Sequence, residues 1–148
     1  MKSITADWKE CIVQYEKMQE NDLPRKVREM YVVSGVSFAE AEENISEEMQ
    51  GFVRGEFDVI NINPAVYKEV FFSDDASADK WFKARVQFIT IDDKSAKEKR
   101  ATYYYLIQAN TFGEAKKNLE EVMKGSIMDY EIVKIEEANI IDVFIKND

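Results

Sequence analysis

The sequence contains no histidine and a single cysteine, Cys11, and these two shortages exclude several chemistries. Without histidine the chain has no Ser-His-Asp triad, no Cys-His pair, no imidazole acid or base and no histidine-ligated zinc. With one cysteine it forms no intrachain disulfide and no multi-cysteine zinc site, which fits a reducing compartment. We expect Cys11 to be a small buried hydrophobic residue and not a nucleophile.

Glycine and long apolar runs are also scarce. The five glycines, at positions 35, 51, 55, 113 and 125, form neither GxGxxG nor GxxxxGK[ST], so no phosphate-binding loop is visible. No apolar run approaches the roughly 20 residues that a membrane helix needs. The first seven residues, MKSITAD, lack the apolar stretch of a secretory signal. We expect a cytoplasmic protein without cofactor and without membrane contact.

What the chain does contain is enough apolar surface for a core, together with an uneven acidity. The sequence is 45% hydrophobic and 12% aromatic, so general disorder is not expected. The net charge is −9, with 8 Lys and Arg against 16 Asp and Glu in residues 1–75, and 12 against 13 in residues 76–148. Such acidity argues against broad attraction to DNA but leaves room for a local basic groove.

The two halves of the sequence resemble each other over their whole length. Trp8 to Met18 aligns with Trp81 to Ile91 at an offset of 73 residues. The segments FAEAEENISEEMQG (38–51) and FGEAKKNLEEVMKG (112–125) are identical at seven of fourteen positions. Residues 57–75 and 130–148 align at the first offset again. This pattern predicts a tandem duplication with repeats over 1–75 and 76–148.

Each repeat predicts one helix with the same signals. Ser37 with Glu40, and Thr111 with Glu114, have the spacing of capping boxes. Apolar residues follow at helical spacing, and Gly51 and Gly125 stand where a left-handed C-cap residue is common. We expect helices near 38–51 and 112–125. The expected apolar stripes are Phe38, Ala41, Ile45, Met49 and Phe52 in the first helix, and Phe112, Ala115, Leu119, Val122 and Met123 in the second.

Alternating and aromatic segments on both sides of the helices predict strands. Hairpin loops are expected at 19–24 and 92–95, and later strands at 57–63 and 66–72 and at 130–136 and 139–145, with Pro64 separating the first two. We therefore predict an α+β fold with a duplicated β-β-α-β-β unit. Its sheets are expected to be antiparallel, each with one packed helix, and related by a pseudo-twofold axis. The short acidic linker 73–79 favours one compact body.

Two basic clusters, each followed by tyrosine, are the main candidates for a binding surface. Under the duplication they form paired basic and aromatic surfaces that could hold phosphates and stack bases. The alternative is that the cations protect strand edges from aggregation while the tyrosines pack in the core, and we favour this second interpretation. The candidate residues are Arg25, Lys26, Arg28 and Tyr31 in the first repeat, and Lys97, Lys99, Arg100 and Tyr104 in the second.

Carboxylates and tryptophans offer weaker signals. Asp74, Asp75 and Asp79, with Asp92 and Asp93, could in principle hold Mg²⁺ or Ca²⁺, but the calcium-loop pattern is absent. We interpret them as a solvated linker and a solvated hairpin turn, so no metal site is predicted. Trp8 and Trp81 begin equivalent strands and are expected to anchor the core.

Several segments resemble a family of small uncharacterised proteins that carries a domain-of-unknown-function label. The resemblance rests on WKECIVQYEK (8–17), SFAEAEENISEEM (37–49), EVFFSDD (69–75), DKWFKARVQFITID (79–92) and EEANIIDVF (136–144). It implies a cytoplasmic protein of gut Bacteroidetes or of their phages and mobile elements. It implies no catalytic or binding residues.

Three functional hypotheses follow. The leading one is a non-enzymatic binding or accessory protein that acts through paired surfaces on a protein or nucleotide partner, as a pseudo-dimer or a higher oligomer. The second is a single-stranded nucleic-acid-binding protein that uses the basic and tyrosine-bearing strands. The third is a metal-dependent enzyme that uses carboxylates.

Overall fold

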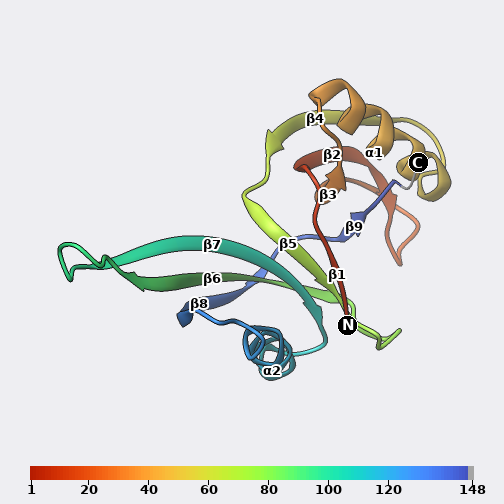
Figure 1. The fold of residues 1–148 in the computed structure, drawn as a ribbon. Coiled ribbons are helices and arrows are strands. Elements are labelled where there is room, and N and C mark those ends of the chain that lie inside the picture. Colours follow the sequence, from red (N-terminus) through yellow and green to blue (C-terminus); the bar gives the residue numbers. More distant parts are fainter. Residues whose placement is uncertain (147–148) are drawn as a thin grey trace. The chain divides into compact units, whose positions relative to one another are not determined.

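The computed structural model describes residues 1–146, so the last two residues of the expected second repeat lie outside the described part (Figure 1). The described chain has two helices and nine strands. In chain order they are β1 (Lys2–Ile4), β2 (Trp8–Met18), β3 (Pro24–Ser34), α1 (Phe38–Phe52), β4 (Phe57–Pro64), β5 (Tyr67–Phe72), β6 (Lys80–Ile91), β7 (Glu98–Ala109), α2 (Phe112–Met123), β8 (Asp129–Ala138) and β9 (Asp142–Phe144). The predicted element order β-β-α-β-β therefore occurs twice, preceded by the short β1.

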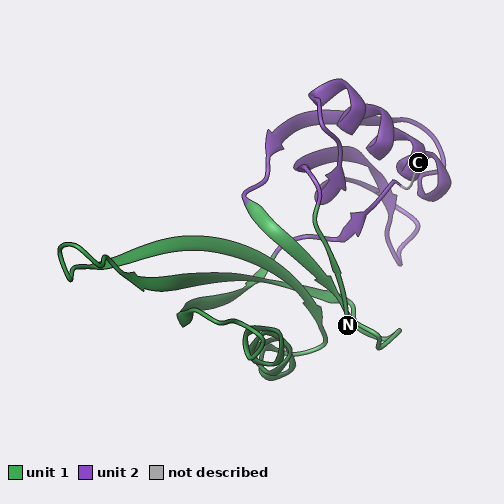
Figure 2. Ribbon diagram, viewed as in Figure 1, with its two compact units in different colours: residues 1–5, 67–138 green, residues 6–66, 139–148 purple. Residues whose placement is uncertain are grey.

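The strands form two sheets that belong to two compact units (Figure 2). Unit 1 comprises residues 1–5 and 67–138, and its sheet has the order β1-β5-β7-β6-β8. Unit 2 comprises residues 6–66 and 139–148, and its sheet has the order β4-β2-β3-β9. Each unit packs one helix, α2 or α1, against its sheet.

Each sheet includes strands from the other half of the sequence, since unit 1 contains β1 and β5 of the first half and unit 2 contains β9 of the second half. β5 belongs to the first half of the sequence but pairs with β7 in unit 1. β9 belongs to the second half but pairs with β3 in unit 2. Both of these pairs are parallel, so the expectation of purely antiparallel sheets is wrong and the sheets are mixed. The compact units consequently have other boundaries than the repeats expected over 1–75 and 76–148.

The helix starts agree with the sequence, whereas the helix ends do not. Backbone N–H groups of Glu40 and Glu114 donate to the hydroxyls of Ser37 and Thr111, each at 3.1 Å, as the capping boxes predict. Gly51 was expected to end α1 in a left-handed conformation, but α1 continues to Phe52 and its C-cap is an extended residue. In unit 1 the C-cap is again not left-handed, and Gly125 lacks a positive φ.

The core of each unit lies between the sheet and its helix. In unit 1 the helix-facing residues of the central strands pack on Ala115, Leu119 and Met123 of α2. In unit 2 the corresponding residues pack on Ala41, Ile45 and Met49 of α1. The helix-facing strand residues are Phe82, Ala84, Val86, Tyr105 and Ile107 in unit 1, and Cys11, Val13, Tyr31 and Val33 in unit 2.

The exchanged strands are joined to these cores by aromatic stacking. Phe71 of β5 stacks on Tyr105 of β7, with ring centres 5.6 Å apart and an interplanar angle of 21°. Phe144 of β9 stacks on Tyr31 of β3, also at 5.6 Å and with an angle of 17°. Because such pairs add stability beyond the burial of area, they hold each exchanged strand at the edge of its partner hairpin.

A register shift recurs in both sheets. It lies between Ile12 and Val13 where β2 pairs with β4, and between Arg85 and Val86 where β6 pairs with β8. The extra residue of each bulge is Ile60 on β4 and Val133 on β8. β4 and β8 end their sheets, and bulges at such edges discourage pairing with other strands.

Some predicted core residues are buried and others are not. Trp8 and Trp81 are 2% and 1% exposed, which confirms them as core residues. Phe38 and Phe112, placed on the apolar stripes by their spacing, are the first residues of their helices and are 53% and 51% exposed. Phe52 is also exposed. Neither described helix combines the length and the apolar character that crossing a membrane requires.

We expect Gly35→Ala to destabilise the protein and Gly51→Ala to stabilise it. A Cβ at Gly35 would lie 2.8 Å from the backbone nitrogen of Ala41, so the β3–α1 corner would have to move, at a cost of about 1–3 kcal/mol. A Cβ at Gly51 meets nothing within 4 Å, and alanine in a helix gains about 0.5–1 kcal/mol. Urea unfolding of both variants measures the difference, and equal midpoints would contradict the described corner.

The strand exchange predicts that cleaving the folded chain in the exposed linker at residues 75–77 leaves the two fragments bound to each other. Unit 1 needs β5 from the first fragment, and unit 2 needs β9 from the second. An engineered protease site there, followed by size-exclusion chromatography without denaturant, tests this. The two fragments have nearly equal length, so elution at about half the mass of the intact chain would show that they separate and would refute the exchange.

Candidate functional site

The structure does not unite the eight candidate residues of the sequence in one surface. Successive side chains of a strand point to opposite faces, so Arg25 and Tyr31 share the α1 side of β3, while Lys26 and Arg28 lie on the other side. Tyr31 is only 5% exposed, and burial together with its hydrogen bond to Glu29 raises its pKa far above the usual value. Tyr31 is therefore a core residue and not part of a basic surface.

The candidates of the second repeat are also separated. The Lys99 ammonium lies 3.6 Å from the Asp92 carboxylate. Arg100 pairs with Glu131 at 2.6 Å and with Glu98 at 3.1 Å, and hydrogen bonds to these carboxylates raise its pKa. Lys97 lies in the turn before β7. Only Tyr104 faces an open cationic surface, and its cations come from other strands.

That surface lies on the sheet face of unit 1 opposite α2, and we call it the cationic row. Because Ala84, Val86, Tyr105 and Ile107 face α2, their neighbours in the chain face the other way. The pairing register then sets Lys134 of β8 opposite Arg85 of β6, Arg85 opposite Tyr104 of β7, and Tyr104 beside Tyr67 of β5. The row thus crosses four adjacent strands with the members Lys134, Arg85, Tyr104 and Tyr67.

The charges of the cationic row are poorly neutralised. Like charges placed directly opposite each other destabilise a sheet, and Arg85 and Lys134 are such a pair. Lys134 has Glu136 at 3.1 Å, but within residues 1–146 no carboxylate lies within 4.0 Å of the Arg85 guanidinium. This arrangement makes no favourable cross-strand charge pair at Arg85.

Lys83 adds a third cation, held by aromatic rings. Its ammonium lies 5.1 Å from the centre of the Tyr104 ring and 5.8 Å from that of the Tyr67 ring. Aromatic faces attract a cation without accepting its hydrogen bonds in the way a carboxylate does. The N–H donors of Lys83 therefore stay available to an acceptor from outside.

These cations surround a shallow hollow of about 200 Å³. Its walls are Lys83, Arg85, Tyr104, Lys134 and Glu136. Pockets that enclose a small organic molecule usually have volumes of about 300–1,000 Å³, so this hollow suits a single anionic group carried by something larger.

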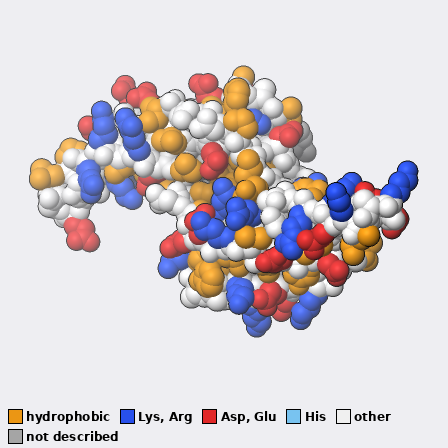
Figure 3. All heavy atoms as spheres, turned by 90° about the vertical axis from the view of Figure 1, so that its left-hand side faces the viewer, with side chains coloured by type: hydrophobic (Ala, Val, Ile, Leu, Met, Phe, Trp, Pro, Cys, Tyr) orange, Lys and Arg blue, Asp and Glu red, His pale blue; other side chains and the backbone are white. Residues whose placement is uncertain are grey.

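The described part of unit 2 has no counterpart of the cationic row. The pairing register sets Glu10, Ile12, Met30 and Asn61 at the places of Lys83, Arg85, Tyr104 and Lys134. Unit 1 carries 13 Lys and Arg against 14 Asp and Glu, while unit 2 carries 7 against 15. Acidic and basic side chains are interspersed on the face of the molecule that Figure 3 presents.

The sequence contained part of the signal for this surface. Lys83 and Arg85 alternate with buried residues in KWFKARVQF, which is typical of one polar strand face. Lys134 lies about 50 residues away, and its position opposite Arg85 depends on the bulge at Val133. Only the folded register brings these residues together.

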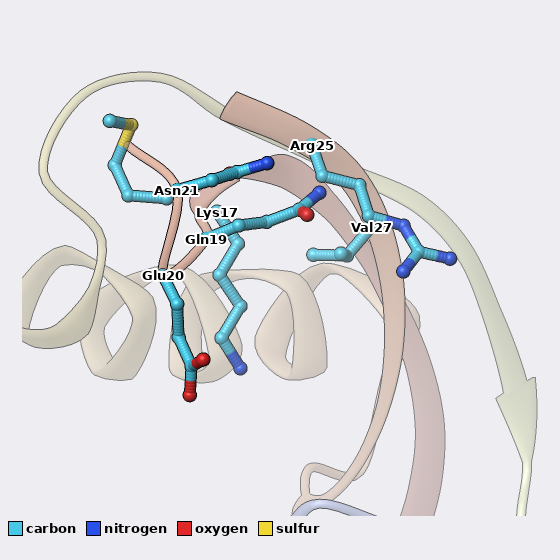
Figure 4. A pocket seen from close by; sticks show the side chains of 7 residues that line it. Lys17, Gln19, Glu20, Asn21, Arg25 and Val27 are labelled. Carbon is cyan, nitrogen blue, oxygen red and sulfur yellow. The ribbon is translucent and has the colours of Figure 1, made fainter. Parts of the chain in front are cut away.

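A second hollow, of about 650 Å³, lies at the β2–β3 hairpin of unit 2 (Figure 4). It includes Arg25 from the sequence candidates, together with Lys17 from the neighbouring strand. Lys26 lines a different hollow with Arg54 and Asp58, and Arg28 donates to Gln14. Arg25, Lys26 and Arg28 of the first basic cluster therefore lie in three different environments and form no common surface.

The carboxylates of the linker and hairpin turn have protein partners. Asp75 accepts hydrogen bonds from Ser77 and Asn110, and Asp92 accepts one from the backbone of Lys94. These hydrogen bonds lower the pKa of both groups. Within residues 1–146 no group of three or more Asp, Glu or Cys side chains is arranged to hold a metal ion.

A polar network distinguishes the helix-facing side of unit 2. The hydroxyls of Tyr15 and Tyr31 both donate to Oε1 of Glu29, at 2.6 and 3.0 Å. Lys17 lies 3.9 Å from the other oxygen of that carboxylate. Burial and the Glu29 carboxylate raise the pKa of Tyr15 to about 12, so the tyrosines act as hydrogen-bond donors at neutral pH.

Cys11 is expected to be unreactive in the folded protein. It lies in the core of unit 2, and burial raises the pKa of its thiol to about 12, although Lys9 acts in the opposite direction. The thiolate is the reactive form, so at pH 8 a disulfide reagent should label Cys11 only after urea is added. Complete labelling of the native protein within minutes would contradict its burial.

The fold and its surfaces define an α+β protein of two mixed sheets with one open cationic sheet face. The chain belongs to the family of the domain of unknown function DUF4494, whose model matches residues 7–147. No curated protein matches the chain.

Proposed function

We propose that this protein is a non-enzymatic binding protein whose cationic row in unit 1 binds the phosphates of single-stranded nucleic acid. The observation that supports the proposal is the opposition of Arg85 and Lys134 across two strands, with no carboxylate of residues 1–146 within 4.0 Å of the Arg85 guanidinium. Phosphate groups supply the missing negative charge. Arginine suits them because its planar guanidinium donates two parallel hydrogen bonds to one phosphate.

The shape of the surface favours a strand of nucleic acid over a free nucleotide. The hollow beside the row is small, and the sheet continues beyond it through Gln87 and Thr102 on the same face. Proteins that bind single strands commonly combine basic side chains along the backbone with aromatic rings that stack on bases. Tyr104, half-buried beside Lys83, supplies an aromatic ring next to the phosphate donors.

The duplication is part of the same proposal. The stacked pairs Phe71–Tyr105 and Phe144–Tyr31, and the two bulges, recur at near-constant offsets in the sequence. These repeated details support an origin by duplication of one β-β-α-β-β unit. After duplication the charged face diverged, so binding is assigned to unit 1 alone and not to paired surfaces. The pseudo-twofold relation and a setting in phages of gut Bacteroidetes stay predictions.

Replacing Arg85 and Lys134 of the row should weaken the binding of a single-stranded oligonucleotide and make that binding less dependent on salt. For Arg85→Gln plus Lys134→Gln we expect the slope of log K against log salt to become shallower by about 1.4, since each phosphate contact on a single strand contributes about 0.7. The measurement is fluorescence anisotropy of a labelled oligonucleotide over a salt series. The matched control is Lys116→Gln plus Lys117→Gln, which removes the same charge from the exposed face of α2.

Two outcomes would reject the assignment. An equal loss of oligonucleotide affinity in the α2 control would show that only net charge matters. The absence of any oligonucleotide binding at low salt would refute the proposal. Lys26→Glu plus Lys99→Glu tests the surface expected from the sequence. We expect that variant to leave the slope of log K against log salt unchanged, because neither residue belongs to the row.

A further inference from the structure

The hollow of unit 2 is built by the two strands of one hairpin and by the loop that joins them (Figure 4). Lys17 and Val27 come from β2 and β3, Arg25 stands opposite Lys17, and Gln19, Glu20 and Asn21 come from the loop. Its volume of about 650 Å³ lies within the range of pockets that accept a small organic molecule.

The loop has a defined conformation. Gln19 donates its backbone N–H to the carbonyl of Leu23 at 3.1 Å, and Asp22 donates to the carbonyl of Gln19 at 3.0 Å. The side-chain oxygen of Asn21 accepts from the backbone N–H of Leu23 at 3.2 Å. Since that oxygen is engaged, the amide nitrogen of Asn21 is the group left to meet a ligand. In Figure 4 the amides of Gln19 and Asn21 point in the same direction.

The hollow carries a second pair of like charges placed directly opposite each other. Lys17 and Arg25 are partners in the β2–β3 register, which is an unfavourable arrangement in a sheet. The nearest carboxylate to Lys17 is that of Glu29 at 3.9 Å, and within the described residues none lies within 4.0 Å of Arg25. At the corresponding places unit 1 has Thr90 opposite Lys99, so this pair is a feature of unit 2 alone.

Between the two cations lies an apolar surface. Val27 is half-buried, and in Figure 4 the side chains of Lys17 and Arg25 extend on either side of it. The hollow thus combines three recognition elements: cations for an anionic group, amides for the polar edge of a ring, and an apolar surface for its face. Side-chain amides are the groups that pair with the N6 and N7 edge of adenine.

We propose that this hollow binds a mononucleotide, with its phosphate on Lys17 and Arg25 and its purine edge toward Gln19 and Asn21. The site is independent of the cationic row in unit 1, because it shares no residue with it and lies in the other unit. Its volume suits a whole small molecule, whereas the hollow of the row suits only one anionic group.

Titration calorimetry of the intact chain with adenosine 5′-monophosphate tests the site. We expect binding that weakens about tenfold or more in Arg25→Gln, because a hydrogen bond to a charged group is lost. Gln19→Ala should weaken the binding of adenosine monophosphate but leave the binding of ribose 5-phosphate unchanged. The matched control is Arg54→Gln, an exposed arginine of the same unit that does not line this hollow. All three positions are exposed, so circular dichroism should show an unchanged fold.

Three results would overturn the proposal. One is no heat of binding at millimolar adenosine monophosphate. Another is equal binding of ribose 5-phosphate and the nucleotide, which would indicate a simple anion site without base recognition. The last is an equal loss in Arg25→Gln and Arg54→Gln, which would indicate attraction by net charge. None of these results depends on whether unit 1 binds an oligonucleotide.

Discussion

The two parallel pairings, β5 with β7 and β9 with β3, are the constraint on which the rest of the structure depends. Each sheet is completed by a strand from the other half of the chain, and each such strand carries a phenylalanine that stacks on a core tyrosine. Without β9, Tyr31 would lose its stacking partner at the edge of the unit 2 core. The halves of the sequence therefore cannot be the compact units, even though they resemble each other closely.

Alternation along the strands then decides where charge lies. Helix-facing positions of β6 and β7 are apolar because they pack against α2. The intervening positions face away from α2 and are occupied by Lys83, Arg85 and Tyr104. On the equivalent face of unit 2 the same places carry Glu10, Ile12 and Met30. Packing against a helix restrains only one face of each sheet. The two units can therefore have similar cores while their other faces carry different charges.

Much of the fold could be predicted, and the candidate site largely could not. Local signals sufficed for the helix starts, since a Ser or Thr hydroxyl and a Glu three residues later act within one turn. The prediction that Gly51 ends α1 was wrong. A glycine near a helix end does not by itself stop the helix when the following residues continue the hydrogen bonding. Tyr31 was a candidate surface residue because of its basic neighbours, although packing in the core was the favoured interpretation, and strand alternation turns it toward α1 and away from Lys26 and Arg28.

The sequence by itself determined the element order, the two helices and the pattern of apolar faces, because these follow from interactions between residues a few positions apart. It also excluded histidine chemistry and intrachain disulfides by composition alone. The tertiary structure alone decided which hairpin each final strand joins, since β5 and β9 are compatible with either sheet by composition. It alone also set Lys134 opposite Arg85. Pairing between distant strands depends on register and bulges, and no local pattern encodes them.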